Sequence, residues 1–147
     1  GYRMIRKKAR EAAFQYLYQL DEPGVGNEPH SAFSAHAKHF ELEQDTLEFS
    51  TRLVQAVLGN LPAIDAMITK HAKEWRVERL GAVEKALLRM GAAELMYFKD
   101  VPASVTLDEI IELAKDFAEA EAPAFLNGIL DPVSKEPSAV AGKVASN

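Results

Sequence analysis

Residues 80–98 read LGAVEKALLRMGAAELMYF, and this stretch decides the fold class of the chain. Val83, Leu87 and Met90 recur at successive turns of a 3.6-residue period, with further apolar residues beside them. The sequence DVP at 100–102 ends the pattern, because proline cannot continue a helix. The spacing therefore predicts one long helix over residues 80–98.

The same period continues on both sides of this helix. It predicts helices over 5–20, 31–40, 45–58, a short segment after Asn60, 106–117 and 124–130. We expect Asn60 to cap the short helix, and the sequence TLDE at 106–109 to form a capping box. The helix over 45–58 carries a predicted core stripe of Leu47, Val54 and Leu58.

No run of residues alternates with period two, so we expect an all-α fold of about seven helices without a sheet. Residues 1–134 are predicted to form one domain made of two small packed helical bundles, with a boundary near 78–80. After Pro132 the chain becomes rich in Ser, Ala, Lys and Gly and loses its apolar stripe. Residues 135–147 are therefore expected to form a flexible C-terminal tail.

Composition excludes several classes of protein. The chain has 147 residues and no cysteine, which rules out disulfides, cysteine-ligated zinc and thiol nucleophiles. No stretch approaches the roughly 20 apolar residues of a membrane-spanning helix. Polar residues interrupt the chain where a signal peptide needs an apolar run. We expect a cytoplasmic protein without membrane contact.

Positive charge is concentrated at the N-terminal end. Five of the seventeen Lys and Arg residues lie within the first ten positions: Arg3, Arg6, Lys7, Lys8 and Arg10. A basic residue at the start of a helix interacts unfavourably with the helix macrodipole and costs about 0.3–1 kcal/mol of stability. A purely structural role would therefore favour acidic residues at these positions. The cluster favours binding of a phosphate backbone. Charge alone leaves RNA, DNA, an acidic protein surface and an ordinary solvated arm open.

The sequence gives little support for a metal site or for a catalytic site. His36, His39 and Glu43 share a helix face and His30 lies nearby, but the sequence fixes no fourth ligand and places Lys38 among them. We interpret these residues as solvated side chains and expect no metal. No phosphate-binding loop, nucleophile elbow or acid–base pair is evident, which predicts a non-enzymatic protein without a cofactor.

The order of residues in several segments is more specific than composition. The segments are RKKAREAAFQYLY at 6–18, LGAVEKALLR at 80–89, AEL at 93–95 with DVP at 100–102, EIIELAK at 109–115 and FLNGILD at 125–131. In this order and spacing they resemble the NusB family of bacterial transcription antitermination factors. The resemblance covers about residues 6–132 and is weakest over 22–45.

The resemblance implies an all-helical, non-enzymatic protein that pairs with ribosomal protein S ten (NusE). It implies binding of a short single-stranded boxA RNA in nascent ribosomal RNA transcripts. In the resulting antitermination complex, RNA polymerase reads through terminators. Some family members are dimers, so a homodimer remains open.

The resemblance also implies site residues. Its RNA-binding residues correspond to Arg6, Lys7, Lys8, Arg10, Glu121, Phe125 and Asn127. The four basic residues would attract phosphates, and Phe125 would stack on a base. Its NusE-binding residues correspond to Tyr18 and Glu84. Structural roles are the alternatives: core packing for Phe125 and Tyr18, a backbone hydrogen bond for Asn127, and pairing of Glu84 with Lys85 or Arg89.

Two other functions remain open at this point. Similar domains occur at the N-termini of ribosomal RNA cytosine methyltransferases, where they assist substrate binding. A protein-interaction adaptor without RNA specificity would explain the basic arm through an acidic partner.

Overall fold

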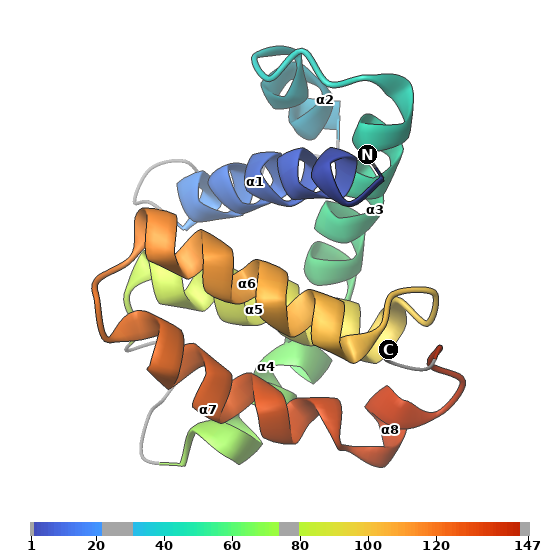
Figure 1. The fold of residues 1–147 in the computed structure, drawn as a ribbon. Coiled ribbons are helices and arrows are strands. Elements are labelled where there is room, and N and C mark those ends of the chain that lie inside the picture. The colour runs from blue at the N-terminus through green and yellow to red at the C-terminus, as the bar shows by residue number, and fades with distance from the viewer. Residues whose placement is uncertain (1, 22–30, 74–79, 145–147) are drawn as a thin grey trace. The chain divides into compact units, whose positions relative to one another are not determined.

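The computed structural model describes residues 2–21, 31–73 and 80–144, and their regular structure is helical (Figure 1). The helices are α1 (Tyr2–Leu20), α2 (Ser31–Lys38), α3 (Gln44–Gly59), α4 (Leu61–Ala72), α5 (Ala82–Tyr97), α6 (Ala103–Phe117), α7 (Ala122–Ser134) and α8 (Pro137–Val140). The predicted all-α class is confirmed, with one short helix, α8, beyond the seven expected segments.

The chain divides into two compact units, residues 1–59 (unit 1) and 60–147 (unit 2). This division lies between α3 and α4, earlier in the chain than the expected boundary near 78–80, of which residues 78 and 79 lie outside the described residues. The reason is α4. Its Ile64 and Ile68 are fully buried, and the helix packs against α5 and α7 of unit 2.

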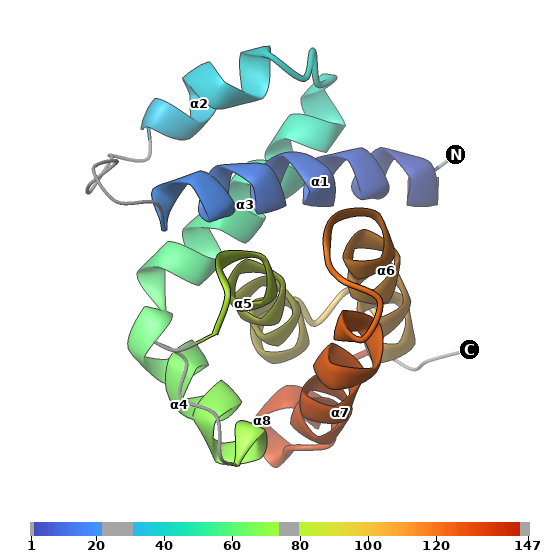
Figure 2. The same ribbon diagram turned by 90° about the vertical axis from the view of Figure 1, so that its left-hand side faces the viewer.

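In unit 1, α1 crosses α3, and α2 contacts both helices (Figure 2). Three small side chains of α1, Ala9, Ala12 and Ala13, are fully buried. Small residues at a crossing allow the two backbones to approach closely. At this crossing the fully buried Ser50 of α3 donates a hydrogen bond from Oγ to the carbonyl oxygen of Ala9, at 2.8 Å.

In unit 2, α5 is the central helix and contacts α4, α6, α7 and α8. Gly91 of α5 is buried, and a Cβ at this position would lie 2.7 Å from Leu130 Cδ1. The absence of a side chain is therefore what lets α7 pack so closely on α5. Arg89 of α5 also donates two hydrogen bonds to the carboxylate of Asp65 on α4, at 2.9 and 2.8 Å.

Two predicted caps differ from the structure. The capping box at 106–109 is wrong, because α6 begins at Ala103 after Pro102. Thr106 lies inside the helix and donates from Oγ1 to Glu94 Oε1 at 2.9 Å. Asn60 does stand at the N-cap of α4, but it makes no side-chain capping hydrogen bond; its carbonyl accepts the Ile64 N–H.

Residues 135–144 also differ from the flexible tail expected. Lys143 donates from Nζ to the carbonyl oxygens of Glu94 and Phe98 at the end of α5, at 2.9 and 2.8 Å. Lys99 in turn donates to the carbonyl oxygens of Ser138 and Ala139 in α8. These polar contacts, together with the buried side chain of Ala139, attach the segment to unit 2, and hydropathy does not reveal the polar contacts.

Candidate nucleic-acid interface

The basic residues at the start of α1 lie on different faces of the helix. Lys7 and Lys8 are exposed, Arg6 is partly exposed, and Arg10 is only 1% exposed. Since each residue advances about 100° around a helix, Arg6 and Arg10 share one face, whereas Lys7 and Lys8 point elsewhere. The structure therefore separates Arg10 from the solvent-facing cluster in which the sequence placed it.

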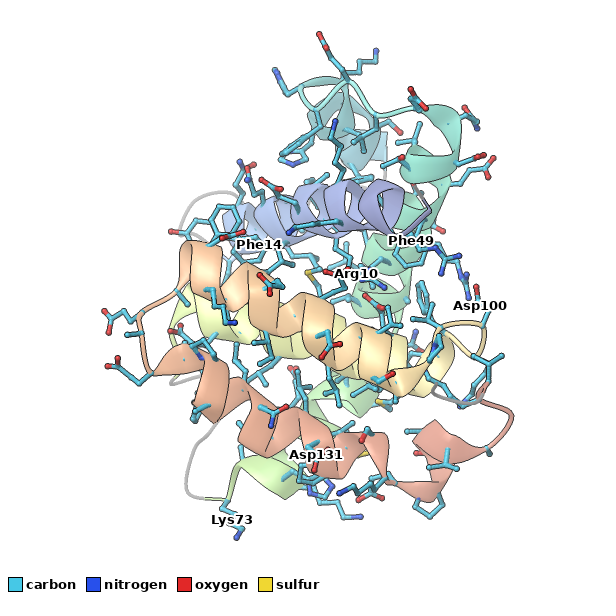
Figure 3. All side chains as sticks on the ribbon, viewed as in Figure 1. Arg10, Phe14, Phe49, Lys73, Asp100 and Asp131 are labelled. Carbon is cyan, nitrogen blue, oxygen red and sulfur yellow. The ribbon has the colours of Figure 1, made fainter. Side chains whose placement is uncertain are left out.

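Arg6 and Arg10 both lie near the ring of Phe49 on α3. The Cζ atom of Arg6 lies 4.4 Å from the centre of the Phe49 ring, and that of Arg10 lies 5.1 Å from it. Figure 3 shows Arg10 on α1 and Phe49 on α3. Both distances are within the roughly 6 Å over which the negative face of an aromatic ring attracts a cation. Phe49 was not among the predicted site residues, because an apolar residue in a helix period gives no sign of a cationic neighbour.

The remaining predicted RNA-binding residues belong to α7 of unit 2. Glu121 is exposed at the N-cap position, and its carbonyl oxygen accepts the Phe125 N–H at 3.3 Å. Asn127 is exposed, Phe125 is half-buried, and Leu126 between them is fully buried. The side chain of Phe125 is therefore accessible in part.

The two residues predicted to bind NusE have different surroundings. Tyr18 is half-buried on α1, with its ring centre 6.2 Å from that of Phe14. Glu84 lies in the first turn of α5, and a Cβ on Gly81 would lie 2.6 Å from its Oε2 atom. A carboxylate over the start of a helix is stabilised by the macrodipole. Arg89, a possible partner of Glu84, pairs instead with Asp65.

Of the histidines considered as metal ligands, the structure describes His36 and His39, and neither belongs to a group of three or more possible ligands among the described residues. His36 packs among aromatic rings, with its ring centre 5.3 Å from that of Tyr16, whereas His39 and Glu43 are exposed. Burial lowers the pKa of His36, and a hydrogen bond to the backbone of Ala12 opposes this shift. His30 lies outside the described residues, among which no group of three or more possible ligands occurs.

A family comparison covers most of the chain. The model of the NusB family matches residues 7–135. The chain belongs to the NusB family. It is thus a member of a family of antitermination factors and is non-enzymatic, as expected from the resemblance.

Individual NusB proteins agree with this assignment in sequence and in structure. The transcription antitermination protein NusB of Symbiobacterium thermophilum is 40% identical over 147 residues, which cover 95% of each chain. The structure of NusB from T. maritima is 30% identical and superposes with a TM-score of 0.75 over 92% of both chains.

A second NusB structure contains a protein partner and RNA. It is a crystal structure of the antitermination factors NusB and NusE in complex with double-stranded RNA. It is 32% identical and gives a TM-score of 0.81 over 90% of this chain and 97% of the other. Within the described part of this chain, no helix is long and apolar enough to cross a membrane.

Proposed function

We propose that this protein is a transcription antitermination factor that binds boxA-type single-stranded RNA in nascent ribosomal RNA transcripts together with NusE. The observation that carries the proposal is the basic start of α1, with Arg6, Lys7 and Lys8 accessible to solvent on a NusB-family fold. A relative's complex with NusE and RNA supports it. The protein would act in the cytoplasm, in a complex with RNA polymerase.

Each predicted RNA-binding residue has a proposed role that fits its exposure. Lys7, Lys8 and Arg6 attract phosphates, which supplies affinity without base information. The partly accessible ring of Phe125 stacks on an unpaired base, and the exposed Asn127 and Glu121 meet polar base edges. Arg10 is 1% exposed, so its contribution is to fix the start of α1 through Phe49 rather than to meet solvent-side phosphates.

NusE is the proposed protein partner, and Tyr18 and Glu84 are its proposed contacts. Both side chains are neither fully buried nor fully exposed, so each has surface that a partner can cover. Tyrosine suits this position because its ring is apolar and its hydroxyl is polar. Through NusE the protein would join the antitermination complex with RNA polymerase.

Fluorescence anisotropy with a boxA-like RNA and a scrambled RNA tests the proposal. Each RNA is measured at two salt concentrations, with and without NusE. We expect selective binding of the boxA-like RNA that NusE strengthens. Equal and weak binding of both RNAs, unchanged by NusE, would contradict it and favour a protein-interaction adaptor.

Substitution of Lys7 and Lys8 by Ala tests the phosphate contacts. For single-stranded RNA, each lost phosphate contact should reduce the slope of log affinity against log salt by about 0.7. Selectivity for the boxA-like RNA should stay the same, because phosphates carry no base information. Lys115→Ala is the matched control, since Lys115 is an exposed lysine of α6 in unit 2.

Phe125→Ala tests the stacking role. If the ring stacks, the variant loses about 1–3 kcal/mol of RNA affinity. Its melting temperature is the control, because a fall of many degrees with unchanged affinity would identify Phe125 as a core residue instead.

A further inference from the structure

Lys143 attaches the C-terminal segment to the end of α5. Its Nζ atom donates to the carbonyl oxygens of Glu94 and Phe98, at 2.9 and 2.8 Å, and the residue is only partly exposed. We propose that Lys143 is a modification site: a small acyl phosphate transfers its acyl group to Nζ, and the amide that forms releases residues 141–144 from α5. This inference goes beyond RNA binding and NusE binding and depends on neither.

The backbone on both sides of Lys143 directs its amino group to α5. Gly142, directly before it, has a φ of +76°, in the left-handed region that favours glycine, and it turns the chain just after α8. Directly after Lys143, the Val144 N–H donates to the carbonyl oxygen of Lys99 at 2.9 Å. The turn and the backbone hydrogen bond therefore hold the short segment against the end of α5.

Lys143 is suited to react as a neutral amine. Burial lowers the pKa of its amino group to about 8; the charges of Glu94 and Asp100 oppose this shift, and the charge of Lys99 adds to it. At pH 7.5 about a quarter of such groups are neutral, compared with about one in a thousand at the ordinary pKa of 10.5. Only the neutral form has a lone pair that can attack a carbonyl carbon.

The number of N–H groups lets Lys143 become neutral without leaving α5. A neutral amine keeps two N–H groups, which is the number that the carbonyl oxygens of Glu94 and Phe98 require. Neither hydrogen bond uses the lone pair of the nitrogen. Because the side chain lies against α5, a small acyl phosphate reaches it more readily than an enzyme that must enclose the lysine.

Transfer of the acyl group changes this count. The Nζ lone pair forms a bond to the carbonyl carbon of the acyl phosphate, and the bond from that carbon to the phosphate oxygen breaks. Inorganic phosphate leaves with the electron pair, and the nitrogen loses one proton to water. The resulting amide has a single N–H group, so one backbone carbonyl loses its donor. Its own oxygen is an acceptor and cannot pair with carbonyl oxygens, and the cation at the end of α5 is gone. Release of the segment lets water satisfy these groups.

Acetyl phosphate is the probe for the reactivity of Lys143. The full chain is treated at pH 7.5, and mass spectrometry measures the initial rate of acetylation at each lysine. We expect Lys143 to react about five- to twentyfold faster than the exposed Lys115 and Lys135, because its larger neutral fraction outweighs its lower basicity. A rate at Lys143 equal to or below the rates at these two lysines overturns the proposal.

Hydrogen exchange of the Val144 N–H, measured by NMR, reports release of the segment. Its hydrogen bond to the Lys99 carbonyl exists only while the segment lies against unit 2. Lys143→acetyl-lysine, introduced as the modified amino acid, should speed this exchange at least about threefold and leave the amides of α6 unchanged. Lys135→acetyl-lysine is the matched control and should leave Val144 unchanged. Unchanged exchange of Val144 in Lys143→acetyl-lysine overturns the proposal.

Lys143→Arg separates Lys143 from the other lysines that acetyl phosphate modifies. Arginine keeps the charge and the N–H donors but stays protonated and does not take the acyl group. After treatment, Lys143→Arg should keep the slow Val144 exchange of the untreated protein. Faster exchange would assign release to another lysine, such as Lys99, and overturn the proposal. If Lys143→acetyl-lysine does not fold, Val144 exchange in wild-type protein acetylated after folding decides.

Discussion

Lys143 caps the end of α5 by donating a hydrogen bond from its Nζ atom to the carbonyl oxygen of Glu94, at 2.9 Å. The Glu94 carbonyl also accepts the backbone N–H of Phe98, so Lys143 supplies a second donor, and a cation at the end of a helix interacts favourably with the macrodipole. Burial lowers the pKa of Lys143 to about 8, with the charge of Glu94 opposing the shift. The amino group of Lys143 therefore caps α5 and also titrates at mildly alkaline pH.

The stability of the protein should depend on Lys143 at alkaline pH. The ordinary pKa of this group is 10.5, so between about pH 8 and 10.5 the unfolded chain holds a proton that the folded protein has released. The unfolding free energy contributed by Lys143 therefore rises with pH across this window. Urea unfolding from pH 7.5 to 10.5 should show this rise in the wild type and not in Lys143→Met. Lys135→Met, at an exposed lysine, is the control and should keep the rise in unfolding free energy. The prediction is contradicted if the unfolding free energies of Lys143→Met and the wild type change with pH in parallel.

Glu136 should contribute stability that disappears in acid. Its Oε1 atom accepts from Lys70 Nζ at 2.9 Å and from His71 Nε2 at 2.7 Å, and these hydrogen bonds lower the pKa of its carboxyl group, Lys70 more than His71. The contribution is present above the ordinary pKa of about 4.5 and is lost as pH falls through the lower folded value. Glu136→Gln should be less stable than the wild type at pH 6, and the difference should shrink toward pH 3. Glu119→Gln, at an exposed acid, is the control; a difference that is independent of pH would count against this explanation.

The same substitution should have opposite effects at two glycines. A Cβ at Gly91 would lie 2.7 Å from the buried Leu130 Cδ1 atom, whereas a Cβ at Gly128 of α7 would meet nothing within 4 Å. Gly91→Ala should therefore destabilise unit 2 by about 1–2 kcal/mol through overpacking. Gly128→Ala should stabilise it by about 0.5–1 kcal/mol, because alanine is the better helix former. Thermal and urea unfolding measure both, and a stabilising Gly91→Ala would show that Leu130 moves aside freely.

The hydrogen bond between Thr106 and Glu94 should also be measurable. Both residues are fully buried, and Thr106 Oγ1 donates to Glu94 Oε1 at 2.9 Å. Thr106→Val keeps the shape and removes the donor, and we expect a loss of about 1–3 kcal/mol. Thr106→Ser keeps the donor and should lose less. Equal losses in the two variants would assign the effect to packing of the methyl group.

Periodicity predicted the helices well because it reports burial along a helix. The pattern of Val83, Leu87 and Met90 correctly indicated the helix that became α5. On α3 the prediction was right in part: Val54 of the predicted stripe is buried, whereas Leu47 and Leu58 are only partly buried and the buried side also contains Phe49, Leu53 and Val57. The crossing with α1 selects that face, and the crossing depends on contacts between residues far apart in the sequence.

The candidate site shows the same limit. The sequence identified a cluster of basic residues, but it could not show that Arg10 is buried or that Arg6 and Arg10 both lie near the ring of Phe49. The contact with Phe49 depends on α3, which lies more than 30 residues farther along the chain. The predicted capping box at TLDE was wrong for a related reason, because these residues fit the start and the interior of a helix equally well. The helix begins earlier, directly after Pro102.

The polar attachment of residues 135–144 has a consequence for the order of events on the ribosome. Domains tend to fold as units and in order of synthesis. Both partners of the hydrogen bond from Ser50 to Ala9 lie in unit 1, which is synthesised before unit 2. The carbonyl oxygens at the end of α5 receive their lysine only when residue 143 emerges. The contacts within unit 1 can therefore form before the segment that completes unit 2 has been synthesised.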